Sequence, residues 1–262
     1  QGGKPLPTRW PHASLPPMTH TLIVGAGITG AALAFHLTRR GEVVTIVSTH
    51  SEGGLASTAS FGWLNASYYL SHPHYRLRHE GLAAHRRLTE ALPTLPTTWP
   101  GCLWYEATGD AQDETATDLA TLGYRVERLT RAQVAARLPA LGPVPETALF
   151  FPEEGIAAPA TLARALIAAS GAKVVRATVQ ALTVEKGRVT GVATDLGPLA
   201  ADRVILATGT GTPALLEPLG YGLPMLKRPG LMLTTNALPP ICPMILATPD
   251  QEVRQDAEGH LH

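Results

Sequence analysis

Hydrophobic positions near the start of the chain follow a strand, helix, strand order. Residues 21–24 form a short apolar run that ends at a glycine, which is typical of a buried parallel strand. In residues 29–40 the apolar positions recur at helical spacing, and Gly41 follows them as a stop signal. Residues 43–47 are rich in β-branched side chains and predict a second strand. This stretch is therefore expected to form a βαβ unit.

The rest of the chain mixes helical and strand patterns. Residues 51–62 are rich in small and hydroxylated residues and predict a loop, and residues 101–128 predict only short strand-like and polar stretches. Lys186-Gly187 is a turn signal, and strand is expected from Leu231 with a proline-rich break at 239–243. Further helices are predicted at 74–92, 131–138 and 159–170, and further strands at 173–179, 181–185, 188–194 and 203–206.

This order predicts a mixed α/β fold in which a nucleotide-binding domain is interrupted by a second, sheet-containing domain. The proline-rich residues 1–19 are set aside as a tail or linker. The nucleotide-binding domain is expected to comprise residues 20–92 and 140–225. The second domain is expected to comprise residues 93–139 and 226–262 and to be incomplete.

Composition narrows the classes of partner. Lys plus Arg and Asp plus Glu each number 21 among 262 residues, so nothing draws the chain to nucleic acid, and a small-molecule substrate is expected. The two cysteines have no metal-ligand or CxxC spacing, which favours a reducing, cytoplasmic location. No run approaches the roughly 20 apolar residues that span a bilayer. The four histidines at 72, 74, 79 and 85 form no recognisable ligand set, so no metal is predicted.

A glycine motif follows the first predicted strand and opens the first predicted helix. It reads Gly25-Ala26-Gly27-Ile28-Thr29-Gly30, the G-x-G-x-x-G pattern of dinucleotide-binding folds. The first glycine permits a tight turn, the second lets the backbone approach a pyrophosphate, and the third lets the helix pack close to the strand. The helix N-terminus offers N–H groups and a positive dipole end to the anion.

The end of the second strand departs from the usual pattern. A carboxylate there commonly accepts hydrogen bonds from the adenosine ribose, but this chain has Ser48, followed by Thr49 and His50. A hydroxyl lacks that charge, so ribose binding is expected to be weaker unless Glu52 contributes. A non-acidic position also suits the extra phosphate of NADP, which keeps an NADP-dependent dehydrogenase as an alternative.

Six further segments resemble one family of flavoproteins. Together with the glycine motif they resemble the glycine oxidase and D-amino-acid dehydrogenase branch of the FAD-dependent D-amino-acid oxidase superfamily, over about residues 21–262. The segments are Val204-Ile205-Leu206-Ala207-Thr208-Gly209, Ala56-Ser57-Thr58-Ala59-Ser60-Phe61-Gly62-Trp63, Glu154-Gly155-Ile156-Ala157-Ala158-Pro159, Arg188-Val189-Thr190-Gly191-Val192, Leu226-Lys227-Arg228-Pro229-Gly230 and Glu252-Val253-Arg254.

The resemblance implies a two-dinucleotide-fold flavoprotein with a Rossmann-like FAD domain and a β-sheet-containing substrate domain. It implies oxidation of the C–N bond of a small amine or amino acid by an oxidase or dehydrogenase, with hydride transfer to flavin N5 and hydrolysis of the imine. The residues implied to bind FAD are Gly25, Ala26, Gly27, Ile28, Thr29, Gly30, Ser48, Thr49, Ser57, Ser60, Phe61, Gly62, Val179, Ala207, Thr208 and Gly209.

Substrate contacts are expected from a smaller set. Arg228 and Arg254 are candidate carboxylate clamps, since a guanidinium holds a carboxylate through two hydrogen bonds. Trp63 is a candidate pocket residue, and Glu252 stands where the family often has an aromatic hydroxyl. No catalytic residue is identified, and Glu153, Glu154 and Asp195 are interpreted as turn residues.

The chain is expected to lack the C-terminal segment through which this family returns to the flavin. This motivates another alternative, a non-catalytic or truncated flavin-fold subunit that needs a partner to complete the active site. A homo-oligomer is equally compatible with the sequence.

Overall fold

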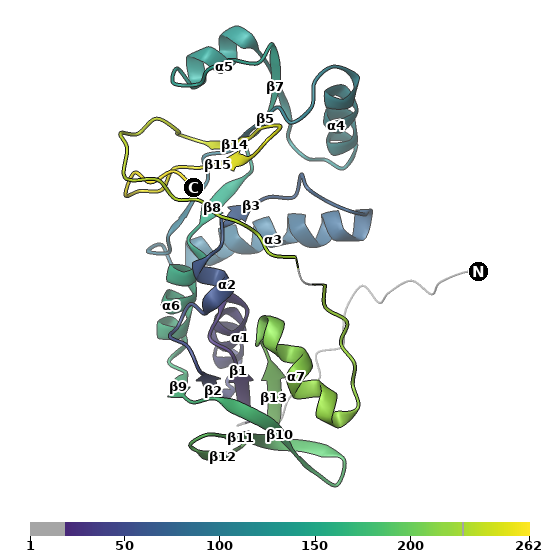
Figure 1. The fold of residues 1–262 in the computed structure, drawn as a ribbon, viewed down its shortest axis with the longest axis vertical. Coiled ribbons are helices and arrows are strands. Elements are labelled where there is room, and N and C mark those ends of the chain that lie inside the picture. The colour runs from purple at the N-terminus through teal and green to yellow at the C-terminus, as the bar shows by residue number, and fades with distance from the viewer. Residues whose placement is uncertain (1–18, 227) are drawn as a thin grey trace, which may run out of the picture. The chain divides into compact units, whose positions relative to one another are not determined.

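The computed structural model describes residues 19–226 and 228–262, so most of the predicted tail, and Lys227, lie outside the described residues. Two compact units are present. The first combines residues up to Gly54 with Ala163–Met225, and the second combines Leu55–Leu162 with Leu226–His262. This division differs from the domains expected from the sequence because it groups residues 55–92 and 140–162 with the second unit. Figure 1 labels most of the elements of each unit.

The first unit is built on a parallel sheet in the order β13-β1-β2-β9. Leu22, Ile23 and Ile46 are fully buried in it, because both faces of a parallel sheet are covered. The helix α1 (Ile28–Thr38) buries Ala31, Ala34 and Phe35, which confirms the predicted βαβ unit. The strands are β1 (His20–Val24), β2 (Val43–Ser48), β9 (Lys173–Arg176) and β13 (Arg203–Leu206).

An antiparallel meander completes the first unit, with β10 (Val179–Glu185), β11 (Arg188–Thr194) and β12 (Gly197–Ala200). Lys186 and Gly187 both have positive φ, at 50° and 76°, as the predicted two-residue turn requires. Leu22 and Val24 of the parallel sheet pack in one cluster with Val192 of the meander. The helix α7 (Thr212–Leu216) adds Leu215 to the same cluster.

The second unit contains a five-stranded sheet in the order β15-β14-β5-β7-β6 and a three-stranded sheet in the order β3-β8-β4. The strands are β3 (Trp63–Leu64), β4 (Thr97–Thr98), β5 (Cys102–Trp104), β6 (Glu127–Thr130), β7 (Thr147–Phe151), β8 (Gly155–Ala157), β14 (Ile245–Ala247) and β15 (Glu252–Val253). The helices are α2 (Leu55–Thr58), α3 (His72–Ala91), α4 (Asp110–Thr121) and α5 (Arg131–Arg137), while α6 (Pro159–Ser170) contains the boundary between the units.

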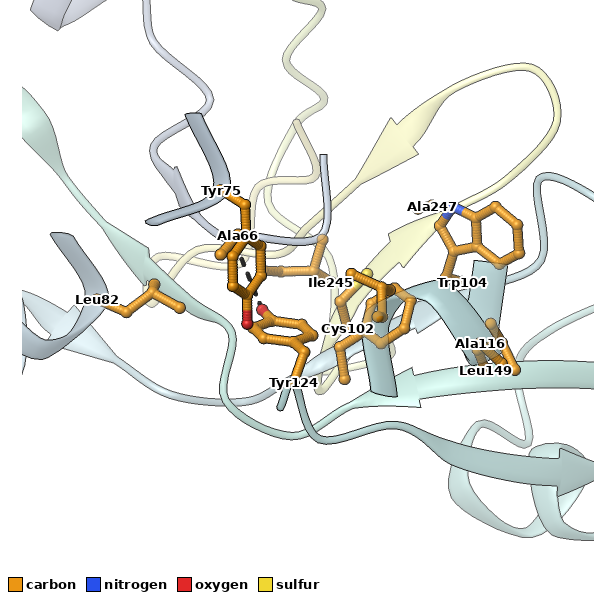
Figure 2. Close-up of a cluster of buried hydrophobic side chains, with 12 residues drawn as sticks. Ala66, Tyr75, Leu82, Cys102, Trp104, Ala116, Tyr124, Leu149, Ile245 and Ala247 are labelled. Carbon is orange, nitrogen blue, oxygen red and sulfur yellow. Dashed lines mark hydrogen bonds between the residues drawn. The ribbon is translucent and has the colours of Figure 1, made fainter. Parts of the chain in front are cut away.

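The five-stranded sheet separates two hydrophobic clusters. Cys102 and Trp104 of β5 point into one cluster, and Leu103 between them points into the other, as strand alternation requires. Figure 2 shows the first cluster, in which the Ala66 N–H donates to the Tyr124 hydroxyl (3.4 Å). Since both faces of β5 are covered, all three of its residues are buried.

Three expectations from the sequence are wrong. Helix α4 fills part of a stretch expected to hold only short elements; it buries only Gln112, Ala116 and Leu119, too sparse an apolar stripe to reveal a helix. Helix α2 interrupts the predicted loop at residues 51–62. Residues 231–238 form no strand, and only β14 and β15 follow.

A buried ion pair joins two segments of the first unit that are far apart in sequence. Glu42 precedes β2 and is 8% exposed, and it forms an ion pair with Arg203 of β13. The Thr21 hydroxyl donates to the same carboxylate oxygen (2.7 Å), and the other oxygen, Oε1, has no partner among the described residues. The charge of Glu42 therefore depends on Arg203, because a buried carboxylate without a cation is strongly destabilising.

Replacing Arg203 by methionine is expected to lower the free energy of unfolding by about 2–4 kcal/mol, because Glu42 would keep only one hydrogen bond. Equilibrium denaturation in urea measures this change. The control is Arg128→Met, which breaks an ion pair with Asp113 in which both side chains are exposed. That loss should be about 0–1 kcal/mol. Equal losses in the two variants would contradict the assigned role of Arg203.

Candidate functional site

The glycine motif forms the turn between β1 and α1, as the sequence predicts. Gly25 has φ of 111°, and a Cβ on it would lie 2.4 Å from the carbonyl oxygen of Ala207. The Ala207 N–H donates to the carbonyl of Val24 (2.8 Å). The motif and the Ala207-Thr208-Gly209 turn therefore lie in direct backbone contact, which only a glycine at position 25 permits.

Two more close approaches shape this turn. A Cβ on Gly30 would lie 2.0 Å from the carbonyl oxygen of Gly25, so the helix packs directly on the turn. A Cβ on Gly54 would lie 3.0 Å from the Cα of Gly27, and the Gly53 N–H donates to the carbonyl of Ala26 (2.9 Å). The loop after β2 thus joins the motif in the folded unit.

The N-terminus of α1 is arranged to receive an anion. Its N-cap residue, Gly27, has no side chain that could cover the helix end, and no acidic residue lies in the first turn. A helix end of this kind presents a positive dipole end and backbone N–H donors. Bare backbone at Gly25 and Gly27 lets a pyrophosphate approach closely, so these residues fit the phosphates of a dinucleotide.

Ser48 lies at the end of β2, where its hydroxyl donates to the carbonyl of His50 (2.9 Å). Thr49 and His50 are exposed. Arg176 of β9 is the register partner of Ser48. The position usually filled by a ribose-binding carboxylate therefore carries a hydroxyl that is already engaged with its own loop.

The other predicted cofactor residues fall into two places. Val179 begins β10 in the first unit, where it pairs with Thr194. Ser57, Ser60, Phe61 and Gly62 belong to the second unit. Gly62 has φ of 74°, and a Cβ on it would lie 2.0 Å from the Ala157 carbonyl oxygen, so the serine-rich segment is held tightly against β8.

Of the four predicted substrate residues, two lie close together and the other two are exposed. Arg254 is 7% exposed; its Nε donates to the Phe61 carbonyl (2.5 Å) and its guanidinium lies 5.4 Å from the Phe61 ring centroid. Burial lowers the pKa of this guanidinium. The Phe61 ring lies edge-on to Trp63 at 6.3 Å, so Arg254 and Trp63 share a neighbourhood. Arg228 and Glu252 are both exposed.

The sequence interpretation of Glu154 as a turn residue is wrong. Its carboxyl group is fully buried. It accepts hydrogen bonds from the Trp63 indole N–H (2.7 Å) and from the hydroxyls of Ser67 (2.5 Å) and Tyr124 (2.9 Å). The nearby Cys102 thiol also lowers its pKa. The run Glu153-Glu154-Gly155 looks like an exposed turn, so no local signal reveals this contact.

Burial raises the pKa of Glu154 from 4.5 to about 7, and its hydrogen-bond donors offset only part of that rise. All three donors are neutral groups, and they come from β3, the following loop and the segment after α4. The carboxyl group therefore joins three parts of the second unit, and its pKa is close to 7.

A second carboxylate lies beside the same aromatic residues. The Tyr68 hydroxyl donates to Glu106 and accepts from the Trp104 indole N–H (3.1 Å). Burial, together with Glu106, raises the pKa of Tyr68. The rings of Trp63 and Tyr68 meet edge to face at 5.0 Å. Phe61, Trp63 and Tyr68 thus form a continuous aromatic row, with Arg254 on Phe61 and Glu106 on Tyr68.

Two other kinds of site are absent from the described residues. Across residues 19–226 and 228–262, no three His, Cys, Asp or Glu side chains are grouped so that they could hold a metal ion. Within the same residues, no helix has the length and hydrophobicity needed to cross a bilayer.

Comparison with known proteins gives a family match over nearly the whole described chain. The family described as DAO, FAD dependent oxidoreductase, matches residues 20–262. The chain belongs to the FAD-dependent oxidoreductase family. The resemblance noted from the motifs is confirmed, and FAD is the cofactor of this family. The match removes the reason for the NADP alternative, which depended on Ser48.

Individual relatives agree with the family. The "Uncharacterized oxidoreductase YurR" of Bacillus subtilis (strain 168) is 32% identical over 227 residues, covering 78% of this chain and 58% of that protein. Glycine oxidase of Pseudomonas putida is 28% identical over 261 residues, covering 92% of this chain and 68% of that protein. The chain thus spans less than two thirds of the Bacillus relative.

Solved structures show the same fold. A crystal structure of glycine oxidase from Bacillus cereus ATCC 14579 has a TM-score of 0.79 at 21% sequence identity, covering 93% of this chain and 69% of that one. L-Proline dehydrogenase from P. horikoshii has a TM-score of 0.80 at 17% identity, covering 94% and 69%. At these identities the likeness establishes the two-domain flavoprotein fold predicted from the sequence.

Gly30→Ala is expected to lower the free energy of unfolding by at least about 2 kcal/mol, because its Cβ would collide with the backbone of the turn. It should also lower retention of FAD during gel filtration. The control is Gly81→Ala, in helix α3, where a Cβ meets nothing within 4 Å. That change should stabilise by about 0.5–1 kcal/mol and leave FAD content unchanged. Similar behaviour of the two variants would contradict the assigned close approach.

The raised pKa of Glu154 predicts a pH-dependent stability. Between pH 4.5 and about 7 the folded chain holds a proton that the unfolded chain has lost. Stability should therefore fall as pH rises through this window, by on the order of 3 kcal/mol. Urea denaturation across pH 4–8 measures this fall, and Glu154→Gln provides the reference because it removes only this titration. A difference between the two proteins that stays constant with pH would contradict the assignment.

Proposed function

We propose that this chain is the FAD-binding part of an enzyme that oxidises the C–N bond of a small amine or amino acid. The observation that carries the proposal is the contact between the glycine turn at Gly25 and the Ala207-Thr208-Gly209 turn, at the N-terminus of α1. The relatives support the reaction class, since they include glycine oxidase, D-amino acid dehydrogenase and 4-methylaminobutanoate oxidase.

In the proposed reaction, FAD accepts the electrons, and the chain binds and orients FAD and the substrate. When bound, FAD supplies the two-electron acceptor for the hydride that leaves the carbon next to the amine. The oxidised product is an imine, and water adds to it to release a carbonyl compound and an amine.

The chain's own contribution is binding and orientation. We assign the pyrophosphate to Gly25, Ala26, Gly27, Ile28, Thr29 and Gly30, at the end of the α1 dipole. The other FAD contacts are assigned to Ser48, Thr49, Ser57, Ser60, Phe61, Gly62, Val179, Ala207, Thr208 and Gly209. Within the second unit, Arg254 and Trp63 are the better supported substrate residues, because Phe61 links them.

The visible absorption spectrum of the purified chain, taken before and after denaturation, tests this proposal. We expect flavin bands, and FAD released into the supernatant after acid or heat. A screen of amines and amino acids should then bleach those bands in the absence of oxygen. A colourless chain that fails to take up added FAD would contradict the proposal and favour a subunit that needs a partner.

A further inference from the structure

Glu154 is fully buried, yet the hydrogen bonds that its carboxyl group accepts come only from neutral donors. A carboxylate in such a place is costly, since burial without a cation disfavours its charge. A buried charge supplied only with neutral donors remains able to attract a cation nearby. Among the donors to Glu154, Trp63 also belongs to the aromatic row of Phe61, Trp63 and Tyr68.

The bond between Trp63 and Glu154 has a fixed direction. An indole N–H can only donate, so the carboxyl oxygen Oε2 must accept at 2.7 Å. A donor bonded to a carboxylate is polarised by it, and electron density shifts toward the indole ring. The face of a tryptophan ring already attracts cations more strongly than other aromatic rings do. Ionised Glu154 should therefore strengthen the attraction of Trp63 for a cation.

Trp63 is partly exposed, whereas Glu154 is not. Part of Trp63 is therefore open to a ligand, whereas the carboxyl group of Glu154 is not. The rings of Phe61 and Tyr68 both pack against the indole, with interplanar angles of 68° in both pairs. The orientation of Trp63 is therefore set by Glu154 at its N–H and by two neighbouring rings.

We propose that the exposed part of Trp63 recognises the ammonium group of a cationic amine, and that Glu154 is the positioning residue that orients and polarises the indole for this. The inference takes its substrate class, an amine, from the proposed function. It adds the residues that recognise the positive charge of that amine. Arg254 lies beside Phe61 in the same unit, but it is 7% exposed and its Nε is bonded to the Phe61 carbonyl, so the ammonium contact is assigned to Trp63 alone.

The raised pKa of Glu154 makes this recognition depend on pH. The charge is absent below about pH 7 and present above it. The attraction for a cation should therefore increase as pH rises through 7. Several titratable or charged groups lie on the elements around Glu154. Those of α3 are Tyr75, Arg78, His79 and Arg86, and Arg86 donates to the backbone carbonyl of Glu153 (3.1 Å). The others are Cys102 of β5, Tyr124 after α4, Glu153, Tyr68 and Glu106 beyond Trp63, and Arg254 near Phe61.

Choline and its uncharged isostere 3,3-dimethylbutan-1-ol form a matched pair of probes, because the charge of choline does not titrate. Calorimetric titration of the purified chain at pH 8 should show choline binding about tenfold more tightly than the isostere. In Glu154→Gln this ratio should fall toward one, while affinity for the isostere stays the same. A glutamine can turn its oxygen to the indole N–H and its NH2 to the two hydroxyls, so the variant removes charge and keeps the bonds.

The pH dependence of the choline-to-isostere ratio distinguishes an effect of the Glu154 charge from a change in structure. In the unaltered chain the choline-to-isostere ratio should rise between pH 6 and 8, and in Glu154→Gln it should stay flat. Trp63→Phe should lower the ratio as well, and the double variant should lose no more than either single variant, because both act through one contact. If Glu154→Gln fails to fold, Trp63→Phe alone decides the outcome.

Three results would overturn the inference: no binding of either probe, equal binding of both by the unaltered chain, or an equal fall of the ratio in Glu106→Gln. The last variant removes a carboxylate that bonds to Tyr68 and not to Trp63. Neither probe needs to be oxidised, and the flavin spectrum is recorded for each variant. Loss of charge recognition with normal FAD content would therefore be distinguished from failure of the proposed enzyme function.

Discussion

The first unit depends on one backbone contact, the approach of the Gly25 turn to the Ala207 turn. β1 and β13 run parallel and in register, so their carboxyl ends, Val24 and Leu206, arrive together at one edge of the sheet. Any side chain at position 25 would occupy the place of the Ala207 carbonyl oxygen. The same lack of side chains brings α1 onto the turn through Gly30 and the loop after β2 onto Gly27 through Gly54. The helix end to which we assign the pyrophosphate has this form because these backbones can touch.

Two buried carboxylates show opposite solutions to the cost of burying charge. Glu42 is paired with Arg203, so its charge is compensated and it joins two segments of the sheet. Glu154 is surrounded by an indole, two hydroxyls and a thiol, so its charge is held without compensation and its pKa rises to about 7. The first arrangement serves structure alone. The second leaves a charge whose state changes near neutral pH, which is why we connect it with recognition of an amine.

The family assignment and the geometry of the glycine turn support FAD binding in different ways. The family match covers residues 20–262 and identifies the cofactor, while the glycine contacts explain how this chain would hold its pyrophosphate. Ser48 departs from the usual carboxylate and is bonded to its own loop. The backbone at the helix end, and not the ribose contact, therefore carries most of the argument for dinucleotide binding.

The sequence alone determined the elements whose signals are local. The βαβ unit, the Lys186-Gly187 turn and the glycine motif were predictable because apolar periodicity and positive-φ glycine positions can be recognised without knowing what lies nearby. The family could also be recognised, since it depends on the order of such segments. Helix α4 escaped prediction because only three of its positions are buried, a number that neighbouring elements decide. Glu154 escaped for the same physical reason: its three donors are distant in sequence, and only the tertiary structure brings them around one carboxyl group.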